Sequence, residues 1–327
     1  MTRDTIINVK DLKKTYRTSK KKPGVLNAAK ALFKKDYEYK DALKEVSFTV
    51  KRGEILGFIG PNGAGKSTTI KALSGVLYPT SGEVNVLGYT PWKERENYVS
   101  HIGVVFGQKP QLYWDLPAMD TFLLHKEIYA IPEKEFERKV KHMVDLLSLD
   151  EVSKTPVRDL SLGERMKCKL VASLLHNPDL VFLDEPSIGL DVIAKNIMRD
   201  FIKETNEKRK TTFIITTHDM QEIERLCDRV VIINHGGIVY DGLLADVKKK
   251  FQTFKVVDVK LETEQKNFRK KGCTILEKQP YELKIQIDTK KTTIKEVVDY
   301  LIREYDVADI NVSDPPIEEI IELIFKG

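Results

Sequence analysis

Two patterns of apolar and polar residues follow each other along the chain. Up to about residue 245, short apolar runs such as "ILGFIG", "LVFLDEP", "TFIITTH" and "RVVIIN" alternate with helical patterns, including one near residues 192–209 and the amphipathic "EKEFERKVKHMVDLLSL". Strands that alternate with helices predict an α/β domain with a largely parallel sheet. We expect this domain over residues 1–245, with a mostly helical subdomain at about residues 94–175.

From Phe251 the pattern restarts. "FKVVDVKL", "CTILEK", "ELKIQID" and "VADINVS" have the composition of strands, and "TIKEVVDYLIREY" and "IEEIIELIF" that of helices. We interpret the order as β-α-β-β-α-β, which predicts a small ferredoxin-like α+β domain over residues 251–327. This part has no His, one Cys and no glycine-rich loop, so its residues indicate no chemistry.

The charge of the chain limits the class of partner. Lys and Arg total 54 and Asp and Glu total 49, a net charge of +5. Residues 18–40 alone carry seven Lys against one Asp and one Glu, which is also +5, so the rest of the chain is neutral overall. Nucleic-acid-binding domains are typically strongly basic. We therefore expect no nucleic acid among the partners.

The cysteines and the apolar runs indicate where the protein works. Cys168, Cys227 and Cys273 are odd in number and far apart, which indicates reduced thiols in a cytosolic protein. No signal-peptide pattern follows Met1. No apolar run approaches the roughly 20 residues that span a bilayer. If the protein works at a membrane, we expect another chain to supply the span.

The strongest motif is a phosphate-binding loop, "GPNGAGKST", which follows a predicted strand and opens a predicted helix. It fits the pattern G-x-x-x-x-G-K-[ST] in full. Glycines let the backbone wrap around phosphate oxygens, and the N–H groups of residues 63–67 then point at the β-phosphate. Lys66 would neutralise phosphate oxygens and Ser67 would coordinate Mg²⁺. The predicted nucleotide-binding residues of the loop are Gly60, Pro61, Asn62, Gly63, Ala64, Gly65, Lys66, Ser67 and Thr68.

"LVFLDEP" supplies the carboxylates that such a loop requires. Four apolar residues end in Asp184, which would hold Mg²⁺ at the carboxyl edge of a buried strand. By strand alternation, we expect Glu185 to point the other way. There it would take a proton from, or orient, a water that attacks the γ-phosphate.

These motifs and their order resemble the nucleotide-binding subunit of an ABC (ATP-binding cassette) transporter over about residues 5–245. "GPNGAGKST" is similar to the Walker A motif, "LVFLDEP" to Walker B, "LSLGE" to the LSGGQ signature, "SIGLD" to the D-loop and "TTHD" to the switch histidine segment. The resemblance implies a P-loop α/β cassette that binds and hydrolyses ATP with Mg²⁺. The segments "FGQ…YWDLP" and "LSLGER" resemble those of a branch of single-cassette ATPases paired with drug-exporter-type permeases.

The resemblance also assigns further site residues. Gln108 matches the Q-loop glutamine by its spacing to Asp115, so it would bind Mg²⁺ and act in catalysis, while Gln111 is an ordinary polar residue. His218 would hydrogen-bond the γ-phosphate and hold Glu185 and water in place. Asp191 would bridge to the Walker A loop across a dimer. Tyr16 would stack on adenine; it lies far ahead of Gly60, and Tyr37 and Tyr39 are alternatives.

In this family the signature serves the nucleotide of a second cassette, which packs head to tail. The resemblance implies that Ser161 donates its hydroxyl, and Gly163 its N–H, to the γ-phosphate held by the other chain. Leu162 replaces the first glycine of the signature and Glu164 replaces the glutamine. A carboxylate aimed at the nucleotide would be repelled, so we expect Glu164 to face away from it. A homodimer is the expected pairing.

Two segments leave alternatives open. Tyr113 and Trp114 either fill the core of the helical subdomain or line a groove for a permease. In the insert at residues 18–40, "VLNAAKALFKK" places apolar residues on one helical face and lysines opposite. This helix either packs on its own domain or contacts permease or anionic headgroups. The apolar residues are Val25, Leu26, Ala29, Leu32 and Phe33.

The sequence therefore predicts the ATPase subunit of an exporter, bound to permease subunits at the cytoplasmic face of the membrane. A soluble ABC ATPase acting on nucleic acid or ribosomes is the competing function. Such proteins carry two cassettes or long coiled coils, and this chain has one cassette and no heptad run. A regulatory role of the C-terminal domain, and import rather than export, remain open alternatives.

Overall fold

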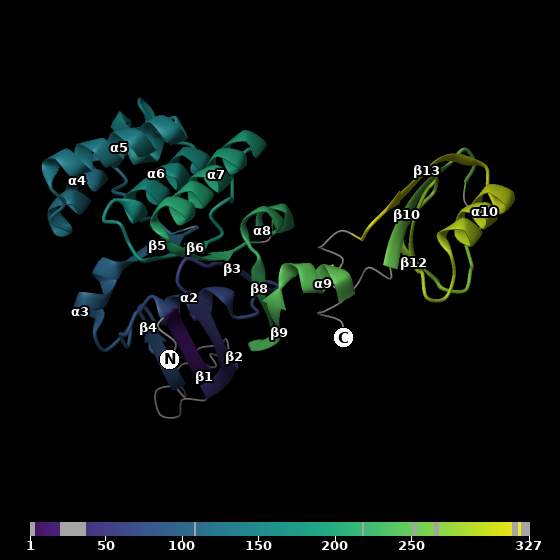
Figure 1. Cartoon of the computed structure of the whole chain (residues 1–327), viewed down its shortest axis with the longest axis horizontal. Coiled ribbons are helices and arrows are strands. Elements are labelled where there is room, and N and C mark those ends of the chain that lie inside the picture. The colour runs from purple at the N-terminus through teal and green to yellow at the C-terminus, as the bar shows by residue number, and fades with distance from the viewer. Residues whose placement is uncertain are drawn as a thin grey trace, which may run out of the picture. The chain divides into compact units, whose positions relative to one another are not determined.

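The computed structural model describes residues 4–19, 37–107, 109–217, 219–250, 254–264, 268–315 and 320–321. The chain divides into two compact units, Met1–Asp241 and Gly242–Gly327. Figure 1 labels the elements of each unit. Among the described residues, no helix is both long and apolar enough to cross a membrane.

A six-stranded sheet with the order β5-β6-β7-β3-β8-β9 forms the centre of the first unit. Its strands are β3 Ile55–Ile59, β5 Ile102–Phe106, β6 Leu180–Asp184, β7 Thr212–Thr216, β8 Arg229–Asn234 and β9 Gly237–Leu243. The pairs from β5 to β8 are parallel. Their apolar runs suit strands that are covered on both faces. Parallel strands place their carboxyl ends at one edge of the sheet, where ligands bind in open α/β folds.

A three-stranded antiparallel sheet with the order β2-β1-β4 completes the core of this unit. Its strands are β1 Thr5–Ser19, β2 Tyr37–Lys51 and β4 Ser81–Val86. This sheet, the central sheet and helix α2 (Lys66–Leu73) share one hydrophobic core, in which the ring centroids of Phe48 and Phe58 are 5.6 Å apart.

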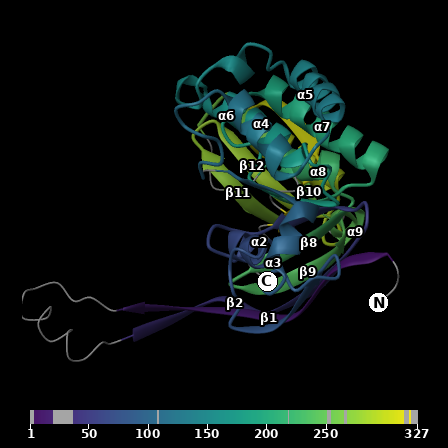
Figure 2. The same cartoon turned by 90° about the vertical axis from the view of Figure 1, so that its left-hand side faces the viewer.

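Strands β1 and β2 form a long hairpin, whose paired strands Figure 2 shows side by side. Residues 18–19 and 37–40 of the predicted basic insert continue these strands. The predicted amphipathic helix "VLNAAKALFKK" lies outside the described residues. The sequence did not indicate the first part of β2, because the side chains there are mostly exposed and show no apolar alternation.

The helical subdomain is built by α4 Ala118–Ile128, α5 Glu133–Leu147 and α6 Leu162–Leu174. The amphipathic spacing of α5 buries Phe136, Val140 and Leu147, as predicted. The prediction of a mostly helical subdomain from residue 94 is wrong for residues 102–106. A short apolar run such as "IGVVF" fits a strand or a buried helix, and its parallel pairing with β6 makes it strand β5.

Short and long helices complete the first unit. They are α3 Arg95–Tyr98, α7 Val192–Arg209 and α8 Met220–Leu226, with single 3₁₀ turns at Val99–His101, Val152–Lys154 and Val157–Asp159. The sequence predicted α7 at its observed position. Both α7 and α8 follow strands of the central sheet directly, so their N-termini lie near its carboxyl edge.

The second unit contains helix α9 Leu244–Lys250 and an antiparallel sheet with the order β11-β12-β10-β13. Its strands are β10 Phe254–Leu261, β11 Cys273–Gln279, β12 Glu282–Asp288 and β13 Val307–Ser313. Helix α10 (Ile294–Glu304) covers one face, and Val257, Ile285 and Leu301 belong to the shared core.

The predicted order β-α-β-β-α-β describes this unit only in part. Helix α10 connects β12 to β13, and β10 lies between those two strands. Between β10 and β11, the described residues 262–264 and 268–272 contain no helix, which corrects the first predicted helix there. That connection is rich in charged residues and has no apolar stripe at helical spacing. Of the predicted last helix, the structure describes only residues 320–321.

Candidate functional site

The phosphate loop connects β3 to α2 at the carboxyl edge of the central sheet. Gly63 and Gly65 have φ angles of 78° and 117°, a conformation that other residues resist. A Cβ at Gly60 would lie 2.3 Å from the carbonyl oxygen of Ile233, so the loop also passes too close to β8 for a side chain. The loop therefore needs these glycines to curl at the N-terminus of α2, where main-chain N–H groups have no helical partners.

Lys66 opens α2 and is buried, with 6% of its surface exposed. Its Nζ donates to the carbonyl oxygens of Gly60, at 2.5 Å, and Pro61, at 3.2 Å. Burial lowers the pKa of Lys66, whereas the charges of Glu185 and Asp184 act to raise it. The ammonium group is thus held inside the loop by neutral acceptors. An anionic phosphate is a stronger acceptor than a carbonyl and would replace them.

Asp184 ends β6 beside two hydroxyl groups. The Ser67 hydroxyl lies 3.2 Å from Oδ1 of Asp184, and the Thr216 hydroxyl donates to the same oxygen at 2.6 Å. Oxygen donors of this kind suit Mg²⁺, which usually takes one or two carboxylates together with water and phosphate oxygens. Among the described residues, no group of three or more His, Cys, Asp and Glu could hold a metal ion. The adjacent oxygens of Ser67 and Asp184 fit a magnesium ion whose other ligands would come from a bound nucleotide and water.

Glu185 follows Asp184 but is not part of the strand. Its φ is 56°, in the left-handed region, and its N–H lies 2.8 Å from the carbonyl oxygen of Thr216 and 3.3 Å from the hydroxyl of that residue. The prediction that strand alternation sets the direction of Glu185 is therefore wrong, because β6 ends one residue earlier. A non-glycine residue with positive φ is uncommon, and such residues cluster at functional sites.

The N-terminus of α6 explains the unusual signature. Ser161 is the N-cap: its hydroxyl oxygen accepts from the N–H of Glu164 at 3.2 Å, and its own N–H donates to Oε2 of Glu164 at 2.8 Å. This reciprocal arrangement is a capping box, which serine and glutamate three residues apart favour. Hydrogen bonding of the Glu164 carboxylate with the side chain and the main-chain N–H of Ser161 lowers the pKa of Glu164. Its negative charge is therefore used at the start of its own helix.

The signature contacts the D-loop of the same chain. A Cβ on Gly189 would lie 2.3 Å from Cδ2 of Leu162, and one on Gly163 would lie 3.1 Å from Cδ2 of Leu190. The leucine that replaces the first signature glycine is thus accommodated because residue 189 has no side chain. Asp191 caps α7 and accepts from the N–H of Ala194 at 2.7 Å.

Comparison with known proteins shows the family to which the chain belongs. Residues 43–188 match the family described as ABC transporter. The chain is 32% identical over 274 residues to the uncharacterized ABC transporter ATP-binding protein MJ1023 of Methanocaldococcus jannaschii, a match that covers 83% of this chain and 92% of that protein. The chain belongs to the ABC transporter family. It is an ATP-binding cassette of this family.

Other relatives of this cassette have named roles. It is 30% identical over 289 residues to the linearmycin resistance ATP-binding protein LnrL of Bacillus subtilis, covering 88% of this chain and 92% of that protein. It is 32% identical over 216 residues to the methionine import ATP-binding protein MetN 2 of Enterococcus faecalis, covering 65% and 62%.

Two solved structures resemble the cassette. One is described as the ATP-binding subunit of an ABC transporter, with a TM-score of 0.63, 29% identity and coverage of 75% of this chain and 93% of that one. The other is the dimeric structure of MJ0796, described as a bacterial ABC transporter cassette, with a TM-score of 0.61, 25% identity and coverage of 73% and 98%. The α/β cassette predicted from the motifs is thus confirmed.

The cassette's candidate for stacking on adenine, Tyr16, lies in the hairpin of β1 and β2. Tyr16 pairs with Lys40, and Tyr37 pairs with Ser19. Because side chains alternate along a strand, Tyr37 and Tyr39 project from one face of the hairpin and Tyr16 from the other. Tyr16 and its two alternatives therefore cannot meet one base from the same face, and the assignment of Tyr16 stays a prediction.

Gln108 and His218 lie outside the described residues, so their expected roles stay predictions. The residues next to them, Gly107 and Asp219, form hydrogen bonds within the described structure. The N–H of Gly107 donates to the carbonyl oxygen of Asp184 at 2.8 Å. Asp219 is the N-cap of α8 and accepts from a main-chain N–H in the first turn of that helix.

Sequence reasoning missed several polar residues around the site. Thr216 binds Asp184, and the signal was the hydroxyl-rich "TT" at the end of a strand. Glu222 is 1% exposed; its Oε2 accepts from the hydroxyl of Ser187 at 2.8 Å, and burial raises its pKa.

Gln111 binds the main chain of β5 through both ends of its amide. It therefore acts as an ordinary structural polar residue.

Tyr113 and Trp114 do not fill the core of the helical subdomain. They are 51% and 53% exposed, in the segment that leads into α4. The Arg165 guanidinium lies 5.4 Å from the centroid of the Trp114 ring, and the N–H of Arg158 donates to the carbonyl oxygen of Trp114 at 2.9 Å. Both contacts hold the Trp114 segment next to the start of α6.

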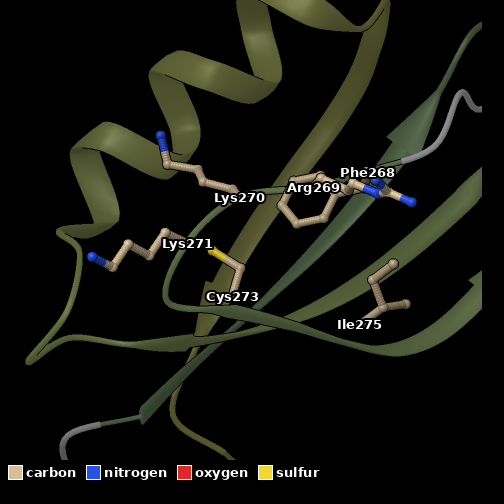
Figure 3. A pocket seen from close by; sticks show the side chains of 6 residues that line it. All are labelled: Phe268, Arg269, Lys270, Lys271, Cys273 and Ile275. Carbon is tan, nitrogen blue, oxygen red and sulfur yellow. The ribbon is translucent and has the colours of Figure 1, made fainter.

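The second unit has a hollow of about 480 Å³ lined by Phe268, Arg269, Lys270, Lys271, Cys273 and Ile275. Figure 3 shows that the three cationic side chains point in different directions. Lys270 donates to the carbonyl oxygen of Glu296 at 2.7 Å and lies 4.8 Å from the Tyr300 ring. The cations therefore do not converge on one point, as they would have to in order to hold a single phosphate.

Proposed function

We propose that this cassette is the ATPase subunit of an exporter and works as a head-to-tail pair with a second copy of itself. ATP and Mg²⁺ bind between the two cassettes and close the pair, and hydrolysis reopens it. Separate membrane permease subunits convert closure into transport, which places the cassette at the cytoplasmic face of the membrane. A ligand shifts such an equilibrium by binding one state more tightly than the other.

The presence of two different anion-binding helix ends in one chain carries this proposal. The α2 end has the glycine loop, Lys66 and the adjacent Asp184. The α6 end has the exposed N-cap Ser161, whose hydroxyl oxygen accepts a hydrogen bond from the N–H of Glu164. The carboxylate at the α6 end, that of Glu164, belongs to the capping box of its own helix, whereas the proposed metal ligands Ser67 and Asp184 lie at the α2 end. The α6 end therefore suits the second half of a site whose first half is the α2 end of the partner.

The side chains have distinct roles in this site. Lys66 binds β- and γ-phosphate oxygens, and Ser67, Asp184 and Gln108 hold Mg²⁺, which supplies charge neutralisation when bound. Glu185 takes a proton from the attacking water or orients it, and His218 holds the γ-phosphate and that water. Ser161 and Gly163 donate to the γ-phosphate of the partner cassette, with Leu162 and Glu164 shaping the helix end. Asp191 contacts the Walker A loop of the partner cassette. Tyr16 stacks on the adenine.

The helical subdomain of the cassette has an exposed apolar surface that could bind a permease. Tyr113, Trp114 and Leu116 are exposed, and α4 exposes three more large apolar side chains. Clusters of exposed apolar residues mark protein interfaces more often than scattered ones do. The further α4 residues are Leu123, Leu124 and Ile128.

Export is the proposed direction, and import is the second candidate. The name of LnrL refers to resistance to linearmycin, which fits export, and LnrL aligns with 88% of this chain. The name of MetN 2 refers to import, but it aligns with only 65% of the chain. Transport by inverted membrane vesicles that contain the cassette and its permease would separate the two directions.

A Glu185→Gln variant tests the proposed reaction. It should still bind ATP, but ATP turnover should fall by roughly 100-fold or more, the usual scale for losing a general base. With ATP and Mg²⁺, it should elute from a sizing column at twice the mass of the chain. The exposed Glu224 provides a control, since Glu224→Gln should leave turnover unchanged. Wild-type turnover in Glu185→Gln would remove this glutamate from the reaction.

A further inference from the structure

A buried lysine on the signature helix binds the chain on both sides of position 108. Lys169 is 8% exposed. Its Nζ donates to the carbonyl oxygens of Phe106 (3.4 Å), Gly107 (3.0 Å) and Lys109 (2.8 Å). An ammonium group has three hydrogens and no acceptor, so three carbonyl oxygens can satisfy it completely.

This arrangement is unusual for a buried charge. Buried lysines are normally paired with a carboxylate, but the described hydrogen-bond partners of Lys169 are all main-chain carbonyls. Burial and the nearby Arg165 both lower the pKa of Lys169. An apolar side chain would avoid that desolvation. The charge is therefore used to fix the main chain of this loop.

The loop that Lys169 holds is connected to both halves of the proposed site. On one side, Gly107 donates its N–H to the carbonyl oxygen of Asp184 at 2.8 Å, next to the proposed metal ligand. On the other side, Lys169 belongs to α6, which begins at the signature residue Ser161. Arg165 of the same helix lies against the ring of Trp114, farther along the same loop segment.

We propose that Lys169 is a positioning residue that makes the loop around Gln108 and the signature helix move as one body. This inference rests on the proposed function. When a nucleotide and its metal reposition the loop, the three carbonyl contacts carry α6, and with it Ser161, toward the orientation that the partner's γ-phosphate needs. Without those contacts, ATP still binds the α2 loop, but binding is no longer coupled to closure of the pair.

A second buried lysine provides a matched control. Lys139 of α5 is 4% exposed, and its Nζ donates to the carbonyl oxygen of Leu175 at 2.8 Å. It also forms an ion pair with Glu135 at 2.6 Å. Its contacts stay within the helical subdomain and do not involve the loop around position 108. Lys139→Met therefore removes a comparable buried ammonium group without releasing that loop.

The test measures the ATP concentration that gives half-maximal dimerisation in the Glu185→Gln background. Adding Lys169→Met should raise this concentration roughly 5- to 150-fold, the usual range of coupling between two sites. The affinity of the monomer for a fluorescent ATP analogue should stay unchanged. Lys169→Arg, whose guanidinium has five N–H donors, should largely restore dimerisation. Lys139→Met should leave both quantities unchanged.

An unchanged midpoint for dimerisation in folded Lys169→Met would overturn the inference, as would an equal shift in Lys139→Met. If Lys169→Met does not fold, Lys169→Gln replaces it. Its amide offers two hydrogens to the three carbonyls, so we expect an intermediate shift, and no shift would overturn the inference. If Glu185→Gln binds ATP but never dimerises, the proposed function itself is wrong, and this inference fails with it.

Discussion

The chemistry of the site depends on a few side chains whose charges are held in place before any ligand arrives. Lys66 is kept inside its loop by carbonyl oxygens, and Asp184 is oriented by the hydroxyl of Thr216. Glu185 is placed by a left-handed backbone conformation. Such preorganisation lowers the cost of arranging charges when a phosphate binds.

Replacing Lys66 with alanine should impair nucleotide binding before it affects chemistry. A hydrogen bond to a charged group contributes about 1.5–3 kcal/mol, so ATP affinity should fall by roughly 10- to 150-fold. Equilibrium titration with a fluorescent ATP analogue measures this loss. Lys71 lies on the same helix α2, and Lys71→Ala should bind normally. Unchanged affinity and turnover in Lys66→Ala would be incompatible with a working phosphate loop.

His176 should make the cassette sensitive to mild acid. Its Nε2 donates to the carbonyl oxygen of Ile102 at 3.0 Å, its ring stacks on Tyr129 at 4.0 Å, and its buried Nδ1 has no hydrogen-bond partner among the described residues. Burial lowers the pKa of His176 to about 4. In the unfolded chain the pKa is about 6.5, so the unfolded state binds this proton more tightly. The free energy of unfolding should therefore fall as pH drops from about 6.5 to about 4, by up to about 3 kcal/mol.

Urea unfolding at pH 7 and pH 5 measures this effect. His176→Phe keeps a ring to stack on Tyr129 but cannot take up a proton, so its stability should depend less on pH. His142, whose side chain is 56% exposed, provides the control, because His142→Gln should keep the pH dependence of the wild type. Equal pH dependence in His176→Phe and the wild type would show that His176 does not cause the acid sensitivity.

Among the elements, those with a regular apolar pattern could be predicted from the sequence and the others could not. The strands β6 and β7 are continuous apolar runs, and α5 has a clear apolar stripe. The first part of β2 is exposed, and β5 is too short for its period to decide. Pairing with β1 and β6 determines both of them, and pairing is a property of the fold.

The site was predictable where a motif fixes the backbone. The spacing of "GPNGAGKST" specifies the loop that Gly63, Gly65 and Lys66 form. The hydroxyl of Thr216 and the ammonium group of Lys169 come from segments more than 30 and 60 residues from their partners, so only the fold brings them there. Strand alternation does not apply to Glu185, because its left-handed φ has no signal in a strand pattern.

The contact between the signature and the D-loop predicts an effect of Gly189→Ala. At φ 74°, alanine costs about 1–2 kcal/mol, and its Cβ also requires Leu162 to move. The free energy of unfolding should fall by more than in Gly88→Ala, which has a φ of 91° and no atom near the added Cβ. Adding Leu162→Ala should recover part of the loss. Additive effects in urea unfolding would show that the two residues do not interact.

At the scale of the whole molecule, we propose that one chain contains two complementary half-sites. The α2 end has the metal-binding carboxylate and the lysine, and the α6 end has the capped serine. Head-to-tail pairing of two copies satisfies both ends at once and gives a closed pair with two-fold symmetry. The nucleotide then belongs to the interface, so its hydrolysis weakens the pair.

The most direct test of this arrangement is the mass of Glu185→Gln in saturating ATP and Mg²⁺, with and without Ser161→Arg. Ser161→Arg replaces the donor at the proposed interface with a bulky cation and leaves the α2 loop of its own chain intact. Our account predicts that Glu185→Gln doubles its mass, whereas the double variant binds ATP with unchanged affinity and stays monomeric. A double variant that still dimerises, or that loses ATP binding as a monomer, would contradict the assignment of the signature to the partner's nucleotide.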